Sequence, residues 1–194
     1  MCTLITGQRT NPSLYGVTSH ELAHSWFQHV LAFNESKYAW MDEGFTVFLD
    51  ALGEQSLNGN MAAFAPAYED YRQVVADGLE EPLTTHADRF DTNTAYRTGS
   101  YDKGAVFLSQ LAYVIGPEAV IKSLRLFYKE FAFTHPTPND FKRIAEKASG
   151  IQLEWYLNDW TRTTNVIDYN IKSVTNKGAQ TEVVLERVGG MGMP

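Results

Sequence analysis

The fold of this chain is decided by two stretches of sequence, His20-Glu21-Leu22-Ala23-His24 and Trp40-Met41-Asp42-Glu43-Gly44-Phe45. Two histidines four residues apart face the same side of a helix, so both imidazoles can reach one ion. Eighteen residues separate His24 from Glu43, and a helix-loop-helix of that length can return the carboxylate to the histidines. Two histidines and one glutamate leave a fourth position open, as in catalytic zinc sites. We therefore predict one zinc ion bound by His20, His24 and Glu43.

Glu21 lies one position along from His20, and we predict that it is the catalytic base rather than a metal ligand. Zinc lowers the pKa of a bound water to about 7, so a neighbouring carboxylate can complete its activation near neutral pH. The alternative is a surface helix in which Thr18 and Glu21 form a capping box. Asn11-Pro12 argues against this alternative, because it starts the helix earlier and places both residues in mid-helix.

Asp42 and Asp50 are candidates for orienting a ligand imidazole, because a metal-bound histidine usually donates its other N–H group to an acceptor. Either acid could instead be solvated or cap a helix, and the sequence leaves these alternatives open. His29 follows His24 by five residues and points to another face of the helix, so we expect it to serve packing or to lie on the surface.

Taken together, these motifs resemble the M1 family of zinc aminopeptidases, which are gluzincins with a thermolysin-like catalytic domain. The Ser25-Trp26-Phe27 that follows His24 fits the same pattern. A separate match lies at Ser100-Tyr101-Asp102-Lys103-Gly104-Ala105, which looks like the family segment that carries its catalytic tyrosine. The resemblance implies that Tyr101 hydrogen-bonds the oxyanion of the tetrahedral intermediate. Without the resemblance, Tyr101 would be interpreted as an ordinary core aromatic residue at the start of a helix.

The resemblance implies zinc-dependent hydrolysis of peptide bonds by a parent enzyme that removes N-terminal residues from peptides. One alternative is a non-catalytic metal-binding module, inactive because it lacks the segment that anchors the substrate. The intact Glu21 and Tyr101 argue against a degenerate parent, because a protein without catalysis needs neither residue. A different hydrolysis at the same zinc, such as epoxide opening, is a third alternative that the sequence leaves open.

The sequence pattern predicts a mainly α fold, a thermolysin-like helical catalytic domain with a short C-terminal β-hairpin. Helices are predicted at residues 11 to about 34, 41–52, 61–77 (interrupted near residue 66), 101–115, 118–131, 138–148 and 153–161. Residues 81–100 are rich in Thr, Asp and Asn and should be loop with short helical turns. Alternation in residues 166–174 and 181–188 around Asn176-Lys177-Gly178 predicts the hairpin. We expect a catalytic domain at residues 1–165 and the start of a following β-sandwich domain at residues 166–194.

Composition narrows the range of partners. The chain has 194 residues, of which 44% are apolar, as in a globular protein with a packed core. Its formal charge of −7 argues against a nucleic-acid partner. No apolar stretch approaches the roughly 20 residues that cross a bilayer. Cys2 is the only cysteine, which excludes a disulfide within the chain and a cysteine-based zinc site.

We expect the chain to be an excised piece of a longer protein. Residues 2–6 have the pattern of a strand that no structure precedes, and the chain stops soon after the strand-like residues 182–186. The resemblance implies an upstream Gly-x-Met-Glu-Asn-type segment that holds the amino group of a peptide substrate. It also implies an N-terminal β-domain and a C-terminal helical domain outside this chain. The compartment stays open, because any signal peptide would lie upstream.

Overall fold

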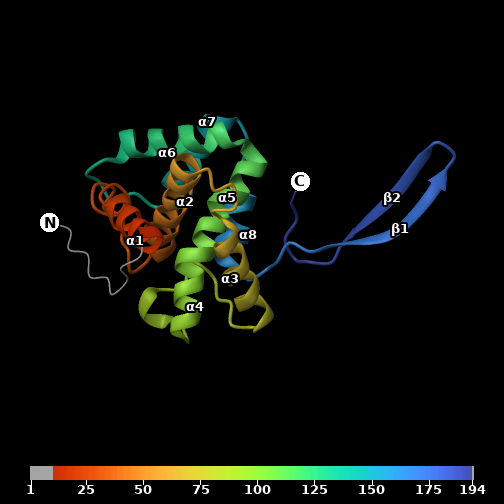
Figure 1. Ribbon diagram of the computed structural model, residues 1–194, viewed down its shortest axis with the longest axis horizontal. Helices are drawn as coiled ribbons and strands as arrows, with labels where there is room; N and C mark the ends of the chain where they lie inside the picture. The colour runs from red at the N-terminus through yellow and green to blue at the C-terminus, as the bar shows by residue number, and fades with distance from the viewer. Residues whose placement is uncertain (1–10, 194) are drawn as a thin grey trace.

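The computed structural model describes residues 11–193, and over this range eight α-helices are followed by one β-hairpin. The helices form one body, from which the hairpin projects (Figure 1). The elements are α1 (Asn11–Ala23), the π-helical turn η1 (Trp40–Gly44), α2 (Phe45–Asn58), α3 (Ala65–Ala76), the 3₁₀ turn η2 (Ala87–Arg89), α4 (Asn93–Arg97), the π-helical turn η3 (Thr98–Lys103), α5 (Gly104–Ile115), α6 (Pro117–Phe131), α7 (Pro138–Ser149), α8 (Glu154–Arg162), β1 (Tyr169–Lys177) and β2 (Gln180–Arg187). The predicted mainly α fold with a C-terminal hairpin is confirmed. The strand predicted at residues 2–6 lies outside the described residues.

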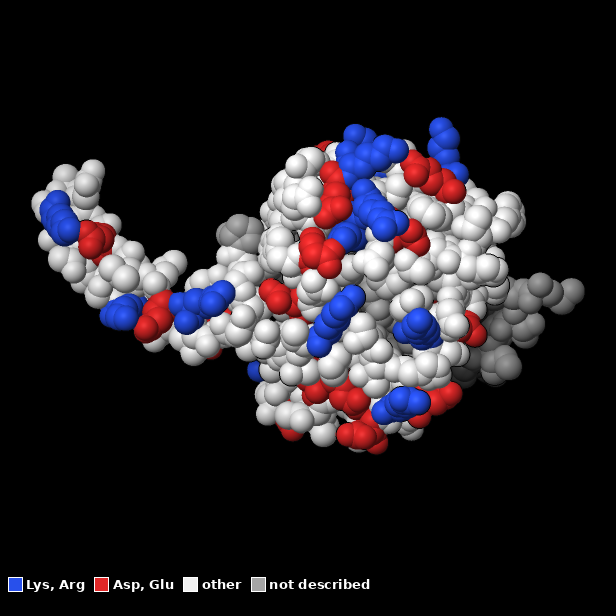
Figure 2. Space-filling model, turned by 180° about the vertical axis from the view of Figure 1, so that it is seen from behind, with Lys and Arg blue, Asp and Glu red and all other residues white. Residues whose placement is uncertain are grey.

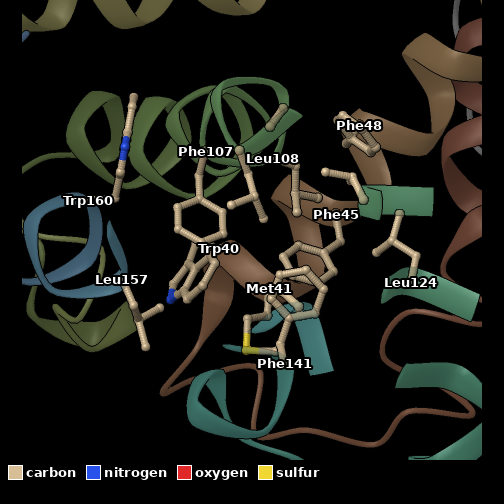
Figure 3. Close-up of a cluster of buried hydrophobic side chains, with 14 of the residues drawn as sticks. Trp40, Met41, Phe45, Phe48, Phe107, Leu108, Leu124, Phe141, Leu157 and Trp160 are labelled. Atoms are coloured by element: carbon tan, nitrogen blue, oxygen red, sulfur yellow. The ribbon is translucent and has the colours of Figure 1, made fainter. Parts of the chain in front are cut away.

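Large aromatic side chains of η1 and α2 form the centre of the core (Figure 3). The Trp40 ring meets Phe107 of α5 edge-on, with 5.1 Å between ring centroids. Phe45 meets Phe141 of α7 in the same way at 4.9 Å. Burial of each such side chain stabilises the fold by about 1.5–3 kcal/mol. Because Glu43 lies between Trp40 and Phe45 in sequence, the same packing fixes the backbone that carries its carboxylate.

Two glycines let the helical segments η1–α2 and η3–α5 cross at backbone contact. A Cβ atom added to Gly44 would lie 2.5 Å from the Cα atom of Gly104, and a Cβ on Gly104 would lie 2.8 Å from the Cα of Gly44. Carbon atoms in favourable contact are about 3.5–4.0 Å apart, so no side chain fits at either position. The crossing therefore requires glycine on both helices and brings η1 and η3 side by side.

The segments next to this crossing are π-helical, which apolar periodicity in the sequence does not predict. Glu43 lies in η1 and Tyr101 lies in η3. A π-helical turn contains one residue more than the α-helical turn that it replaces, and it occurs frequently at functional sites. The helices predicted from residues 41 and 101 are confirmed in place, although the first continues to Asn58 rather than ending at residue 52.

The first helix ends at Ala23, so the prediction that it runs to about residue 34 was wrong. Gln28 has a φ of 106°, which no α-helix accommodates, and the chain turns there. The loop that follows buries Leu31 and Phe33 in the core. The backbone N–H of His24 still donates to the carbonyl of His20 at 3.2 Å, so the two histidines keep their helical spacing.

The remaining helices agree closely with the prediction. Pro66 stands in the first turn of α3, where proline is tolerated, so the helix starts there rather than being interrupted. Residues 81–100 contain only η2, α4 and the beginning of η3, as expected for a loop with short helical turns. Helices α6, α7 and α8 lie within one or two residues of their predicted bounds.

The predicted hairpin is confirmed, with a turn at Gly178 that has a φ of 67°. β1 and β2 pair antiparallel from Tyr169 opposite Arg187 to Lys177 opposite Gln180. Every residue of both strands is exposed. Past the strands, the backbone N–H of Met191 donates to the carbonyl of Val166 at 3.1 Å, and this bond pairs the segments before β1 and after β2 at the base of the hairpin.

Charged side chains of both signs are mixed on the face shown in Figure 2, without a continuous basic patch. Among the described residues, ion pairs join Lys147 with Glu130 and, on the hairpin, Lys172 with Glu186 at 3.0 Å. Within residues 11–193, no helix has both the length and the apolar character that a membrane crossing requires.

We expect Gly44→Ala to lower the free energy of unfolding by roughly 1–3 kcal/mol or more, because its Cβ meets backbone that cannot give way. The matched control is Gly16→Ala in α1, where an added Cβ has no neighbour within 4 Å. This change should instead stabilise the helix by about 0.5–1 kcal/mol. Urea unfolding of both variants checks the prediction, and equal midpoints for Gly44→Ala and wild type would contradict it.

Candidate metal centre

The three predicted metal ligands lie together at the surface where α1 meets η1. The Nε2 atoms of His20 and His24 are 3.2 Å apart. The Oε2 atom of Glu43 lies 3.2 Å from Nε2 of His20 and 3.4 Å from Nε2 of His24. The fold thus returns the carboxylate to the two histidines as the spacing predicts. Glu21 is half-buried on α1, directly after His20.

The separations among these donor atoms fit a zinc ion. Zinc bonds of about 2.0–2.1 Å at tetrahedral angles place neighbouring ligand atoms roughly 3.3–3.4 Å apart. The observed separations of 3.2, 3.2 and 3.4 Å agree with this geometry. Two imidazole nitrogens and one carboxylate oxygen are also a donor set that zinc binds in catalytic centres, with one further position for another ligand.

The electrostatics of the cluster favour a cation. Burial opposes the charged form of His24, but Asp42 and Glu43 outweigh it and raise the pKa of His24 to about 10. Burial likewise opposes ionisation of Glu43, but contacts with His20, His24 and Tyr101 outweigh it and lower the pKa of Glu43 to about 2. The two carboxyl groups therefore create a field that stabilises positive charge between the imidazoles, and a divalent ion can take the place of the proton.

The Nδ1 atom of His24, on the side of the ring away from Glu43, lies close to oxygen atoms of three buried residues. This atom lies 2.9 Å from Oδ1 of Asp42, 3.2 Å from Oγ1 of Thr46 and 3.3 Å from the carbonyl oxygen of Phe27. Such contacts fix the ring orientation and the tautomer of a ligand histidine. Asp42 was one of two sequence candidates for this role. Thr46 was missed, although it lies four residues after Asp42 and so shares its helix face.

Asp50, the other candidate, holds the neighbouring turn of α1. It accepts a hydrogen bond from the hydroxyl of Ser19, the residue before His20. Burial raises the pKa of Asp50. Its contact therefore joins α2 to the turn that carries His20, rather than holding an imidazole directly.

Tyr101 of η3 lies against the same cluster. Its ring stacks on the His20 ring with 5.8 Å between centroids and an angle of 7° between planes. Burial, and then the Glu43 carboxylate, raise the pKa of Tyr101 above its ordinary value. The phenol therefore keeps its proton near neutral pH and can donate a hydrogen bond. The structure thus brings together a potential metal site and a phenol donor from segments far apart in sequence.

The sequence of the chain matches one protein family and several known proteins. The model of the peptidase family M1 domain matches residues 4–160. Aminopeptidase M1 of Arabidopsis thaliana is 27% identical over 184 residues, which cover 92% of this chain and 20% of that protein. Human glutamyl aminopeptidase is 26% identical over 169 residues, with 82% and 17% covered. The chain therefore spans about one fifth of the length of these relatives.

Solved structures share the fold. A mutant of the M1 zinc metallopeptidase from Deinococcus radiodurans, bound to a Tyr-Ser-Ala substrate, matches with a TM-score of 0.63. The match is 22% identical and covers 75% of this chain and 32% of that one. Aminopeptidase A of Legionella pneumophila, in complex with aspartic acid, matches with a TM-score of 0.58 and 20% identity over 81% and 18%. These matches confirm the predicted fold of an M1 catalytic domain.

We expect the wild-type chain to bind one zinc ion and His24→Ala to lose it, because the variant lacks one of the three converging donors. His29→Ala is the matched control, since His29 is exposed and lies only five residues away. Elemental analysis of the purified proteins gives the zinc content. Equal zinc in wild type and His24→Ala would rule out the site, whereas equal zinc in wild type and His29→Ala is expected.

Proposed function

The chain belongs to peptidase family M1, and we propose that it carries the zinc-binding catalytic machinery of an aminopeptidase, with His20, His24 and Glu43 as the ligands of one zinc ion. The observation that supports this most strongly is the convergence of three donor atoms within 4.8 Å of one another. The similar proteins named aminopeptidases support the removal of N-terminal residues from peptides as the reaction. Because the chain spans only part of their length, this proposal concerns the whole protein.

In the proposed reaction, zinc, Glu21 and Tyr101 have separate roles. Zinc, when bound, supplies a Lewis acid that makes a water molecule acidic enough to react near neutral pH. Glu21 takes the proton of the attacking water and passes it to the nitrogen of the departing amine. Tyr101 donates a hydrogen bond to the peptide oxygen, which becomes negatively charged as the water adds. The stacking of Tyr101 on His20 supports this role, because it keeps the phenol beside the ligand cluster.

Asp42 and Thr46 are proposed to keep His24 oriented for the metal. Their oxygens lie 2.9 and 3.2 Å from its Nδ1 atom, so its Nε2 atom is directed toward Glu43. A carboxylate behind a ligand histidine also increases the basicity of the imidazole.

The domain boundary near residue 165 is also a proposal. Helix α8 ends at Arg162, and the hairpin that follows is exposed along both strands. One face of the hairpin carries the apolar side chains of Tyr169, Ile171, Val174, Val183 and Leu185. A two-stranded hairpin is at best marginally stable by itself. These features support residues 1–165 as part of the catalytic domain and residues 166–194 as the start of a β-sandwich domain.

A second candidate function is metal binding without turnover by residues 1–194 alone. The observation that favours it is the short span of the chain relative to its aminopeptidase relatives. In this case the centre would bind zinc, and groups that hold the substrate would come from other parts of the protein.

We expect residues 1–194 alone to release little or no arylamine from an aminoacyl-arylamide, while the full-length protein turns the substrate over. The reason is the resemblance, which implies that the anchor for the substrate amino group lies upstream. Both proteins are loaded with zinc and followed by absorbance. Equal rates would show that residues 1–194 hold every group that the reaction needs.

Glu21→Gln in the full-length protein should lower kcat steeply and leave the zinc in place. Glutamine is nearly isosteric with glutamate but cannot accept the proton, and loss of a general base typically costs 10²- to 10⁴-fold, about 3–5 kcal/mol of barrier. Zinc content and steady-state kinetics are measured on the same preparation. Loss of zinc from Glu21→Gln would assign Glu21 to the ligands instead.

Tyr101→Phe should lower kcat by roughly 10²- to 10³-fold, because it removes one donor to the oxyanion. KM should change much less, since this donor acts mainly in the transition state. A raised KM with kcat near the wild-type value would instead make Tyr101 a residue that packs against the substrate.

A further inference from the structure

A buried lysine stands at the end of the π-helical turn that carries Tyr101. The side chain of Lys103 is 1% exposed, and its Nζ atom donates to Oε1 of Glu80 at 2.6 Å. The same ammonium group donates to the carbonyl of Thr163 at 3.2 Å. The Glu80 oxygen also accepts from the hydroxyl of Tyr71 at 3.1 Å. One buried cation therefore connects η3 to α3, to the segment after α3 and to the chain after α8.

Stability alone does not account for this network. Taking both charges out of water costs several kcal/mol per ion, and apolar residues of similar volume are often as stabilising. Burial lowers the pKa of Lys103, while Glu80 opposes this shift, which reflects the cost of keeping the ammonium there. What a buried ion pair provides beyond an apolar contact is a fixed direction, because the charge has only one set of acceptors. Lys103 thus fixes the position of the residue at which η3 joins α5.

The position of this junction decides where Tyr101 lies. If η3 lost its extra residue and became α-helical, the preceding residues would rotate by about 100° around the helix axis. That rotation would carry Tyr101 away from His20, on which it now stacks. On one side of the junction, the contact between Gly104 and Gly44 sets the position of α5. On the other side, Lys103 at the end of η3 donates to Glu80 and to the carbonyl of Thr163.

We propose that Lys103 and Glu80 are a positioning pair, whose buried ion pair holds η3 in its π-helical register and keeps the phenol of Tyr101 against the metal centre. The proposal rests on the proposed role of Tyr101 as a hydrogen-bond donor in catalysis. The polar contacts of Lys103 and Glu80 are with each other, with Tyr71 and with the Thr163 carbonyl, so both act through Tyr101.

The test is the double variant Lys103→Met/Glu80→Gln in the full-length protein. It removes both charges together and keeps an oxygen that can accept from Tyr71. We expect unchanged zinc content and KM, and a kcat about 10- to 100-fold lower, because a misplacement on the order of 1 Å can cost 10²-fold. In the Tyr101→Phe background, the same double change should lower kcat by less than about twofold, since effects that pass through one group do not add.

Two further variants keep the result interpretable. Lys142→Met/Glu154→Gln removes a lysine–glutamate pair between α7 and α8 and should leave kcat unchanged. Glu80→Gln alone leaves Lys103 an amide oxygen and the Thr163 carbonyl as acceptors, so it tests the pair if the double variant does not fold. It should lower kcat in the same direction by a smaller factor.

The proposal is overturned if the double variant keeps its kcat, if it loses zinc, or if its effect multiplies fully with that of Tyr101→Phe. If Tyr101→Phe itself leaves kcat unchanged, the proposed role of Tyr101 fails, and a crystal structure of Lys103→Met/Glu80→Gln judges the positioning separately. Displacement of the Tyr101 ring from His20 supports the pair as a positioning device. A ring that keeps its centroid separation of 5.8 Å from His20 overturns it.

Discussion

The backbone contact between Gly44 and Gly104 is the constraint on which the rest of the site depends. Helices that meet through ordinary side chains keep their axes 8–10 Å apart, at about the distance that side chains fill. Glycine at both positions removes this spacing, so η1 and η3 lie side by side. Glu43 is the residue before Gly44, and Tyr101 is three residues before Gly104. The same contact therefore delivers a carboxylate and a phenol to the two histidines of α1.

Near this crossing, partly buried charges and a strained backbone conformation occur within one small region. Partly buried Asp42 and Glu43 face the imidazole of His24. Contacts within the cluster outweigh desolvation for His24 and Glu43, whereas burial still raises the pKa of Asp42. Gln28 adds a backbone conformation that costs on the order of 1–3 kcal/mol in a residue other than glycine. Its neighbour Phe27 presents the carbonyl that lies 3.3 Å from Nδ1 of His24. The strained residue Gln28 thus directly follows the residue whose carbonyl oxygen faces the ring of His24.

The sequence predicted the parts of this arrangement that depend on local spacing. Two histidines four residues apart and the returning Glu43 were enough to predict the cluster, and helix caps and prolines marked most helices. The early end of α1 and the two π-helical turns were not predictable, because apolar periodicity does not distinguish a helix from a buried turn or a π from an α turn. Lys103 was missed for another reason. Its role depends on Glu80, a partner that only the folded chain brings near.

The π-helical turn η3 joins the candidate metal centre to a separate buried ion pair. One of its residues, Tyr101, touches the candidate metal centre, and another, Lys103, enters a separate buried ion pair. A helix normally hides its apolar residues and leaves charges in water, because desolvation is expensive. At the end of η3, by contrast, Lys103 is buried, although the adjacent helix α5 contributes apolar side chains to the core. An apolar side chain could slide within that core, whereas an ammonium group fixed by two oxygen acceptors and one aromatic ring cannot. The cost of burying Lys103 is therefore best understood as the cost of keeping Tyr101 in one orientation.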